Sequence, residues 1–368
     1  MVCRIYSFNG KLEPIGITYT ALGDYELLHY DAGTFDISMP LSAQYADTLR
    51  NDHIILIDNM FVGLIENYRI HRGDGVQTVR ATGRDIRCLL DFRVTVPDDI
   101  VETGAPAGYI SASGHTESVM KYFVNKSLVN PSYARRKIEG VQIAPDLKRG
   151  TENDAYYSRF ESLLAVEKKI GERAKLGYRL SIKDQSLVFD VAAGVDHSAS
   201  QTANMPVLFD VDRGTLSSFD FASEAQASGS AFYCTRSGAE FEDEAFTQTY
   251  YFDDQITSGL VRREKHLNIS VATDEENIYD EMETVARKDM ESYKATESYS
   301  CDVTRQIYTY GVDYNVGDIV TIRDTYAGIQ ADRQLVGIKV AESESGIQYT
   351  ATFGDTSLTK FDLIKRGG

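Results

Sequence analysis

One pattern of short strands occurs twice in this chain, near its two ends, and it constrains the fold more than any other feature. In the first of three matching blocks, residues 49–57 (LRNDHIILI) correspond to residues 314–322 (YNVGDIVTI). Residues 61–65 (FVGLI) correspond to 335–339 (LVGIK), and residues 75–85 (GVQTVRATGRD) to 346–355 (GIQYTATFGD). Because the three blocks keep the same order, the pattern predicts a duplicated β-barrel. Two unrelated barrels with similar turns are the alternative.

The second block carries a glycine inside an apolar strand in each copy. Gly63 and Gly337 are paired by this alignment, and a glycine at such a position predicts a β-bulge or a close approach of another backbone. Alternating apolar and polar residues around both blocks support the assignment of strands. The same periodicity extends over residues 1–97, which we expect to form the first β-barrel.

Residues 98–204 have a different texture and predict an α+β insertion. Helices are expected over residues 116–128 and 157–175, the second capped by Asp154 and ended by Gly177. A hairpin is expected next, with strands 178–182 and 187–191 around a turn at 183–186. Residues 205–235 and 298–368 are expected to form the second barrel. The intervening residues 236–297 are expected to form an acidic, helical insertion whose helix begins at a Thr273 and Glu276 capping box.

Composition limits the possible functions. The 368 residues are enough for two to four domains, and 55 Asp and Glu against 38 Lys and Arg leave a formal net charge of −17. Such a balance argues against a protein that grips phosphate backbones, although an acidic wall would let DNA slide past. The longest aliphatic run, residues 54–57, is far too short to span a bilayer, so no stable membrane insertion is expected. The four cysteines form no CxxC pair and are expected to be buried thiols.

The sequence contains no recognisable catalytic constellation. Its six histidines are scattered without HExxH spacing, and neither a GxSxG elbow nor a Walker motif occurs. Residues 111–115 (SASGH) have a nucleophile-like composition but are expected to be a linker. We therefore predict no catalytic residue, no cofactor or cofactor-binding residue and no metal site. Acidic residues at 242–244 and 253–254 leave open a divalent cation site, with a solvated loop as the favoured interpretation.

Interface residues cannot be assigned from sequence. A basic cluster at residues 135–137 and tyrosine pairs at 156–157 and 250–251 are candidates, but a solvated loop is the favoured interpretation of the cluster and core packing that of the tyrosine pairs. A carboxylate pair of a glycosidase is also not excluded by sequence, because its geometry is three-dimensional.

These features together resemble a known family. The doubled barrel, the two insertions and the closing segments 316–320 (VGDIV) and 353–355 (FGD) are similar to hub proteins of phage baseplates, including the N-terminal hub region of siphophage tail-associated proteins. The resemblance implies a fold that is α+β and mostly β, with two β-barrel tube domains and two inserted α+β domains. It further implies a trimeric, pseudo-sixfold ring that joins the tail tube to the tail tip and lets DNA pass through its lumen without specific binding.

The same resemblance implies partners and a location. The expected partners are a distal tail or tail tube protein, a tape-measure protein, and a spike, fibre or receptor-binding protein. The chain is expected at the tip of the virion tail, after assembly in the bacterial host cytoplasm. It is not expected to be an enzyme. Two alternatives remain from the sequence: a cell-wall-degrading glycosidase or peptidase, and a module that binds host-surface carbohydrate.

Overall fold

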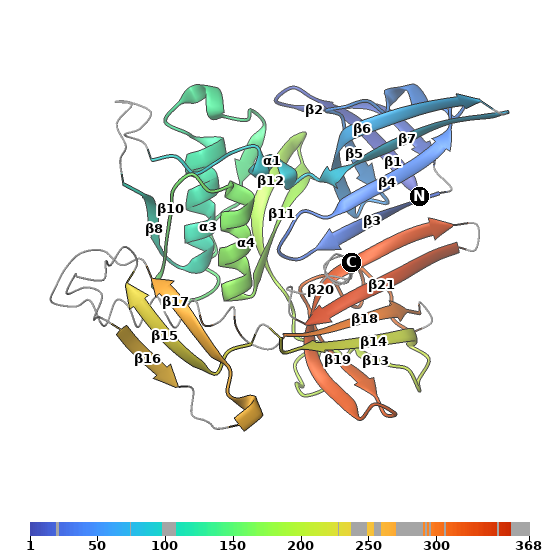
Figure 1. Cartoon of the computed structure of the whole chain (residues 1–368). Helices are drawn as coiled ribbons and strands as arrows, with labels where there is room; N and C mark the ends of the chain where they lie inside the picture. The colour runs from blue at the N-terminus through green and yellow to red at the C-terminus, as the bar shows by residue number, and fades with distance from the viewer. Residues whose placement is uncertain are drawn as a thin grey trace. The chain divides into compact units, whose positions relative to one another are not determined.

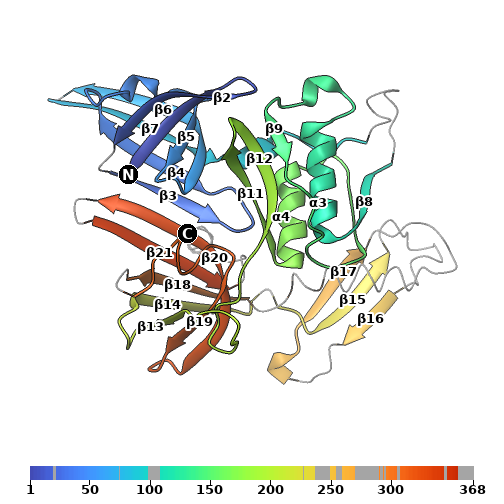
Figure 2. The same cartoon turned by 180° about the vertical axis from the view of Figure 1, so that it is seen from behind.

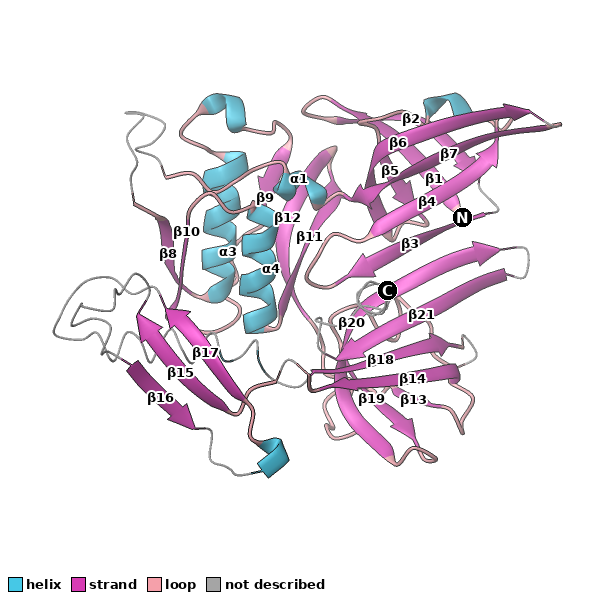
Figure 3. Cartoon of the chain, viewed as in Figure 1, coloured by secondary structure: helices cyan, strands magenta, loops and turns pink. Residues whose placement is uncertain are grey.

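The computed structural model describes most of the chain in two compact units. The described residues are 1–19, 22–73, 75–97, 108–226, 228–236, 249–253, 259–269, 290, 293, 296–304, 307–343 and 346–354. One unit comprises Met1–Asp220 and Tyr299–Thr356, and the other Phe221–Ser298 and Ser357–Gly368. Strands dominate (Figure 2 and Figure 3), and the two longest described helices, α3 (Thr116–Val124) and α4 (Leu163–Ala174), lie in the first unit. The α+β, mostly β class expected from the sequence is confirmed.

The first set of strands lies in the N-terminal part of the chain, drawn in blue in Figure 1. Its strands are β1 (Val2–Phe8), β2 (Leu12–Tyr19), β3 (Leu22–Leu28), β4 (Thr34–Pro40), β5 (Ile54–Ile57), β6 (Phe61–Gly73) and β7 (Val76–Asp85). Hydrogen bonding arranges them in the order β3-β4-β7-β6-β5-β1-β2. Alternate residues of β4 and β7 are buried, as period-2 patterning requires.

The second set repeats this order with strands that are far apart in sequence. Its members are β13 (Leu208–Asp210), β14 (Leu216–Glu224), β18 (Thr296–Val303), β19 (Ile319–Asp324), β20 (Ile329–Ser343) and β21 (Gly346–Gly354). They are arranged β14-β18-β21-β20-β19, which matches β3-β4-β7-β6-β5 strand for strand in both spatial and chain order. The sequence repeat is therefore present as a repeated strand order.

The two sets are joined edge to edge. β3 of the first set pairs antiparallel with β20 of the second, from Gly23 opposite Glu342 to Leu28 opposite Gly337. This pairing makes one 13-stranded sheet, and its described strands are not closed into the separate barrels that the sequence led us to expect. Alternation along a strand reports which face is buried but not which strand lies next to it, so the repeat alone could not distinguish closed barrels from joined open sheets.

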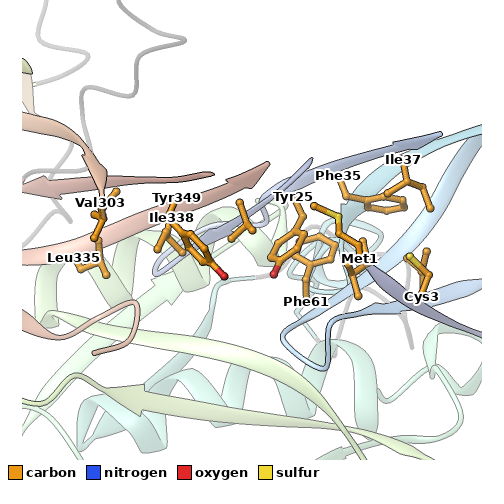
Figure 4. Packing of buried hydrophobic residues seen from close by; sticks show 14 of the residues in the cluster. Met1, Cys3, Tyr25, Phe35, Ile37, Phe61, Val303, Leu335, Ile338 and Tyr349 are labelled. Carbon is orange, nitrogen blue, oxygen red and sulfur yellow. The ribbon is translucent and has the colours of Figure 1, made fainter. Parts of the chain in front are cut away.

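A single hydrophobic cluster spans both sets. Tyr25, Phe35 and Phe61 from the first set and Ile338 and Tyr349 from the second belong to the same buried cluster, shown in Figure 4. Tyr25 and Phe61 stack with ring centroids 5.3 Å apart, and Phe35 meets Phe61 edge-on at 5.7 Å. The two copies thus share one core, and neither can be removed without exposing the apolar face of the other.

The register of the two copies can be derived from their β-bulges. The pairing of β6 with β7 shifts at Glu66, and that of β20 with β21 shifts at Val336, 270 positions later. Both hairpins also close with this offset, Gly73 opposite Val76 and Ser343 opposite Gly346. The same offset places the buried pair Val79 and Ala81 on the buried pair Tyr349 and Ala351.

Two of the three sequence blocks were consequently aligned incorrectly. The first block, which aligns Ile55 with Val320, is in register. Ile55 pairs with Gly63 and Val320 pairs with Arg333, and Arg333 lies 270 positions after Gly63. The second block was displaced by four residues, since Gly337 corresponds to Asn67, and the third by one. A one-residue slip moves every side chain to the opposite face of a strand, so only burial could reveal that error. The close neighbours of Gly63 are side chains and not another backbone, because a Cβ there would lie 2.7 Å from the Phe61 ring and 2.8 Å from the Phe35 ring.

The α+β insertion belongs to the first unit. It contains β8 (Ile110–Gly114), β9 (Val141–Ile143), β10 (Asp154–Ser158), β11 (Leu176–Lys183) and β12 (Ser186–Ala193), with helices α3 (Thr116–Val124) and α4 (Leu163–Ala174) and a π-helical turn at Asn125–Val129. The short helix α1 (Cys88–Asp91) precedes it, and 3-10 turns lie at Ala46–Thr48, Ala134–Arg136 and Gly259–Val261. The expected first helix and the β11–β12 hairpin are confirmed.

The second expected helix begins later than predicted. Asp154 is the first residue of strand β10, because β10 pairs with β8 and its Tyr156 and Ser158 side chains are buried. Helix α4 begins only after Ser162. Lys175 ends the helix in a left-handed conformation with φ of 57°. Gly177 lies in β11, where a Cβ would approach the His29 ring to 2.4 Å.

The second unit contains a small sheet in which β15 (Ala231–Arg236) lies between β16 (Thr249–Asp253) and β17 (Glu264–Ile269). β15 pairs antiparallel with β16 and parallel with β17. The expected helix at Thr273 and Glu276 and the acidic residues 240–244 lie outside the described residues.

Candidate assembly interface

The described residues offer no obvious reaction centre. No group of three or more His, Cys, Asp or Glu side chains among them is placed to hold a metal ion. Of the acidic residues considered, Asp253 ends β16, whereas Asp254 and residues 242–244 lie outside the described part of the chain. No described helix is long and apolar enough to cross a membrane.

The small clusters singled out in the sequence are distributed over different environments. Arg135 and Arg136 lie in a 3-10 turn, where Arg136 donates to the Val94 carbonyl. Lys137 forms an ion pair of 2.8 Å with Glu139. The basic cluster is therefore partly satisfied by its own surroundings, and we find no feature that marks it as a contact surface.

The tyrosine pair at 156–157 divides between core and surface. Tyr156 is buried, and burial raises its pKa to about 12, whereas Tyr157 is exposed. Tyr250 and Tyr251 lie on β16 opposite Cys234 and Tyr233. Residues 111–114, expected to be a linker, instead form most of β8 and pair with β10, because alternating small residues can form a strand as readily as a loop. All four cysteines are buried, as expected.

The junction between β3 and β20 shows how the two copies recognise each other. Glu26 lies opposite Lys339 and Tyr25 opposite Val340. Lys339 also approaches Asp24, with 3.3 Å between its Nζ and Oδ1. Burial raises the pKa of Glu26, and the Lys339 charge opposes that shift. An acidic β3 thus meets a basic residue of β20 across an antiparallel pair of strands.

β6 offers a corresponding edge that no described strand occupies. Residues Asn67 to Gly73 pair with β7 on one side only, and all of them are exposed. By the 270-residue offset this segment corresponds to residues 337–343 of β20, the stretch that β3 covers. Tyr68 and Ile70 expose 41% and 45% of their surface, which is high for apolar side chains within a strand.

β14 is the counterpart of β3 and lies at the end of the strand order. Phe219 contacts Tyr299 of β18, with ring centroids 6.1 Å apart, and Tyr25 is the backbone partner of Phe35 in β4. Matching the aromatic pair Phe219 and Tyr299 to Tyr25 and Phe35 aligns Ser217 to Asp220 with Gly23 to Glu26, an offset of 194, although Leu216 is buried and its counterpart Leu22 is half exposed. Ser217, Ser218 and Asp220 are exposed, whereas the corresponding residues of β3 are covered in part by β20.

An independent contact supports the equivalence of the neighbouring strands. Ser38 of β4 pairs with Arg80 of β7. In the second copy Thr350 of β21 donates a 2.6 Å hydrogen bond to Asp302 of β18. Thr350 lies 270 positions after Arg80, and Asp302 lies 264 positions after Ser38, the offset that also relates Phe35 to Tyr299.

Comparison with known proteins gives this arrangement a family. A family model described as Siphovirus ReqiPepy6 Gp37-like protein matches residues 3–355. The chain belongs to this family. A comparison with curated proteins found no significant match.

Solved structures share the fold of this chain over almost its whole length. A prophage MuSo2 43 kDa tail protein from Shewanella oneidensis matches with a TM-score of 0.58 at 13% identity. The match covers 96% of this chain and 98% of the Shewanella chain. The tail protein from Neisseria meningitidis MC58 has a TM-score of 0.57 at 15% identity and 96% coverage of both chains. Prophage tail protein gp18 from Listeria monocytogenes EGD-e has a TM-score of 0.54 at 10% identity, with 99% and 98% coverage. The chain therefore has the fold of phage tail proteins.

The sequence did not identify the strand edges as candidate surfaces. Residues 68–71 (YRIH) alternate apolar and basic side chains, which is typical of any half-exposed strand. That this segment lacks a neighbour on one side among the described strands follows from the assembled sheet and not from the local sequence. Asp220 could be found only after β14 had been matched to β3.

Proposed function

We propose that this protein is a structural hub of a phage tail, in which three copies form a closed ring. The observation that carries this proposal is the doubled strand order. Three chains that each contribute two equivalent strand sets place six similar sets around one axis, so a threefold ring presents pseudo-sixfold symmetry. Such a ring can join a sixfold tail tube to a threefold tip.

The proposal assigns roles to the remaining features. The ring passes DNA through its lumen, and the acidic balance of the chain, with a net charge of −17, disfavours adhesion of phosphate. Its neighbours are a distal tail or tail tube protein, a tape-measure protein, and a spike, fibre or receptor-binding protein, at the virion tail tip. We retain the four-part division at residues 97, 204, 235 and 297 as part of this proposal, and we expect the insertions to carry contacts specific to each partner.

The role is proposed to be non-enzymatic. Fold likeness to tail proteins and membership of a siphovirus family both support a structural component. Cell-wall hydrolysis and binding of host carbohydrate remain outcomes that an experiment can distinguish. Incubation of the purified chain with peptidoglycan should give no soluble fragments, and cell-wall polymers should show no saturable binding.

Native mass spectrometry and electron microscopy of the full chain test the ring directly. A species of three chains with a central opening is expected at micromolar concentration or in purified tails. A chain that is strictly monomeric at every concentration and is absent from tails would contradict the proposal.

A further inference from the structure

The duplication specifies a partner for the two strand edges described above. Within the chain, β3 pairs with β20; the corresponding pairing would be β14 with β6. These two strands cannot easily meet within one chain, because β18, β21, β20, β3, β4 and β7 lie between them in the sheet. We propose that β14 of one copy pairs antiparallel with the Asn67–Arg72 segment of β6 in a second copy. This inference rests on the proposed ring and names its subunit interface.

The internal junction predicts the register of this pairing. Gly23 to Glu26 face Glu342 to Lys339, and the offsets of 194 and 270 transfer these pairs to Ser217 to Asp220 facing Arg72 to Arg69. Arg69 then lies opposite Asp220, where the internal junction has Lys339 opposite Glu26. Both junctions therefore place a basic residue opposite an acidic one at this position, Lys339 and Glu26 in the internal junction and Arg69 and Asp220 in the proposed one.

The neighbouring pair is apolar in both junctions. Ile70 would face Phe219, as Val340 faces Tyr25. Ile70 is 45% exposed in the single chain, and Phe219 is only partly buried, so the pairing would cover apolar surface on both strands. Added backbone hydrogen bonds supply affinity, while the side-chain pairs select the register.

A second copy explains these edges better than an unrelated strand. Any extended segment could satisfy the β6 backbone, but β14 presents an aromatic and then an acidic residue, Phe219 and Asp220, as β3 presents Tyr25 and Glu26. A ring built in this way alternates internal β3–β20 junctions with β14–β6 junctions between chains. The sheet would then continue around the ring without the exposed edge that invites aggregation in a monomer.

Charge reversal tests the pairing without disturbing the fold, since both side chains are exposed. Arg69→Asp and Asp220→Arg should each raise the concentration at which half of the rings dissociate by at least about tenfold, equivalent to about 1.4 kcal/mol. Combining both changes in one chain should restore association to within about threefold of the unmodified chain. Lys183→Asp, a matched reversal on the exposed β11–β12 hairpin, should have no effect.

Cross-linking tests the register itself. Directly opposed strand residues are close enough for a disulfide, so a chain with Arg69→Cys and Asp220→Cys should give covalent dimers and trimers on oxidation. Pairing Lys183→Cys with Asp220→Cys should give none. Rings that form normally yet neither cross-link nor respond to charge reversal would overturn this interface and leave the proposed hub intact. A chain that never associates would overturn both.

Discussion

Glu167 provides the sharpest test of the core energetics. It lies on α4 and is fully buried among apolar residues, and neither carboxyl oxygen has a hydrogen-bond partner among the described residues. Burial therefore raises its pKa well above the ordinary value. In the folded protein the group is protonated at a pH at which the unfolded chain has already lost the proton.

The sign of the resulting pH dependence follows from proton binding. Below the unfolded pKa of about 4.5 both states hold the proton, and Glu167 causes no pH dependence. Above it the folded state holds one proton more, so the free energy of unfolding falls by up to about 1.4 kcal/mol for each pH unit until the folded pKa is passed. The loss attributable to Glu167 accumulates at this slope over the part of the range from pH 5 to pH 7 that lies below the folded pKa.

Glu167→Gln isolates this effect, because glutamine keeps the shape and cannot ionise. We expect the free energy of unfolding of the variant, relative to the unmodified chain, to rise steadily from pH 5 to pH 7 in urea titrations followed by circular dichroism. Glu167→Met should add a pH-independent gain of about 1–3 kcal/mol over Gln by removing the unsatisfied polar atoms. Glu152→Gln, at an exposed position, is the control. A difference that stays constant across this pH range would refute the reasoning.

Two further predictions concern packing and thiols. Gly83→Ala should destabilise the first unit strongly, by at least about 2 kcal/mol, because the new Cβ would lie 1.9 Å from the Leu64 carbonyl oxygen; Gly108→Ala, with open space around it, should change the unfolding midpoint little. Iodoacetamide at pH 8 should leave the native thiols unmodified while labelling all four after denaturation in urea, as judged by intact mass. The reason is that burial raises three thiol pKa values to about 12, those of Cys3, Cys88 and Cys301. Rapid labelling of the folded chain would contradict that account.

Local patterns predicted elements well where one face of the element is buried. Val119, Met120 and Phe123 form a helical stripe, and the helix is present. The hairpin of β11 and β12 turns at Asp184 and Gln185, both with positive φ, as expected of a short polar turn. In each case the residues that determine the element are close to one another in the sequence.

Non-local relations were not predictable in the same way. The start of α4 was misplaced because Asp154 is a good capping residue by type, but the pairing of β10 with β8 holds it in a strand. The register of the repeat failed at Gly63 because a Val-Gly dipeptide matched by composition and not by position. Both errors arise where a partner distant in sequence decides the outcome, and a local residue pattern does not identify that partner.

The proposed interface also has a consequence for the size of the assembly. β14 and β6 are different surfaces, so their pairing is heterologous, and a heterologous contact either closes into a ring or continues as a filament. The internal junction joins the same two strand types, β3 with β20, so each added copy should rotate by about the same angle at both junctions. If six such rotations complete a circle, three chains close the ring and leave neither β14 nor the Asn67–Arg72 segment of β6 without a neighbouring strand. We therefore expect the mass to reach a plateau at three copies as concentration rises. Growth beyond that number, with Arg69 and Asp220 still cross-linking, would show that the strand pairing is right and that the two junctions turn by different angles.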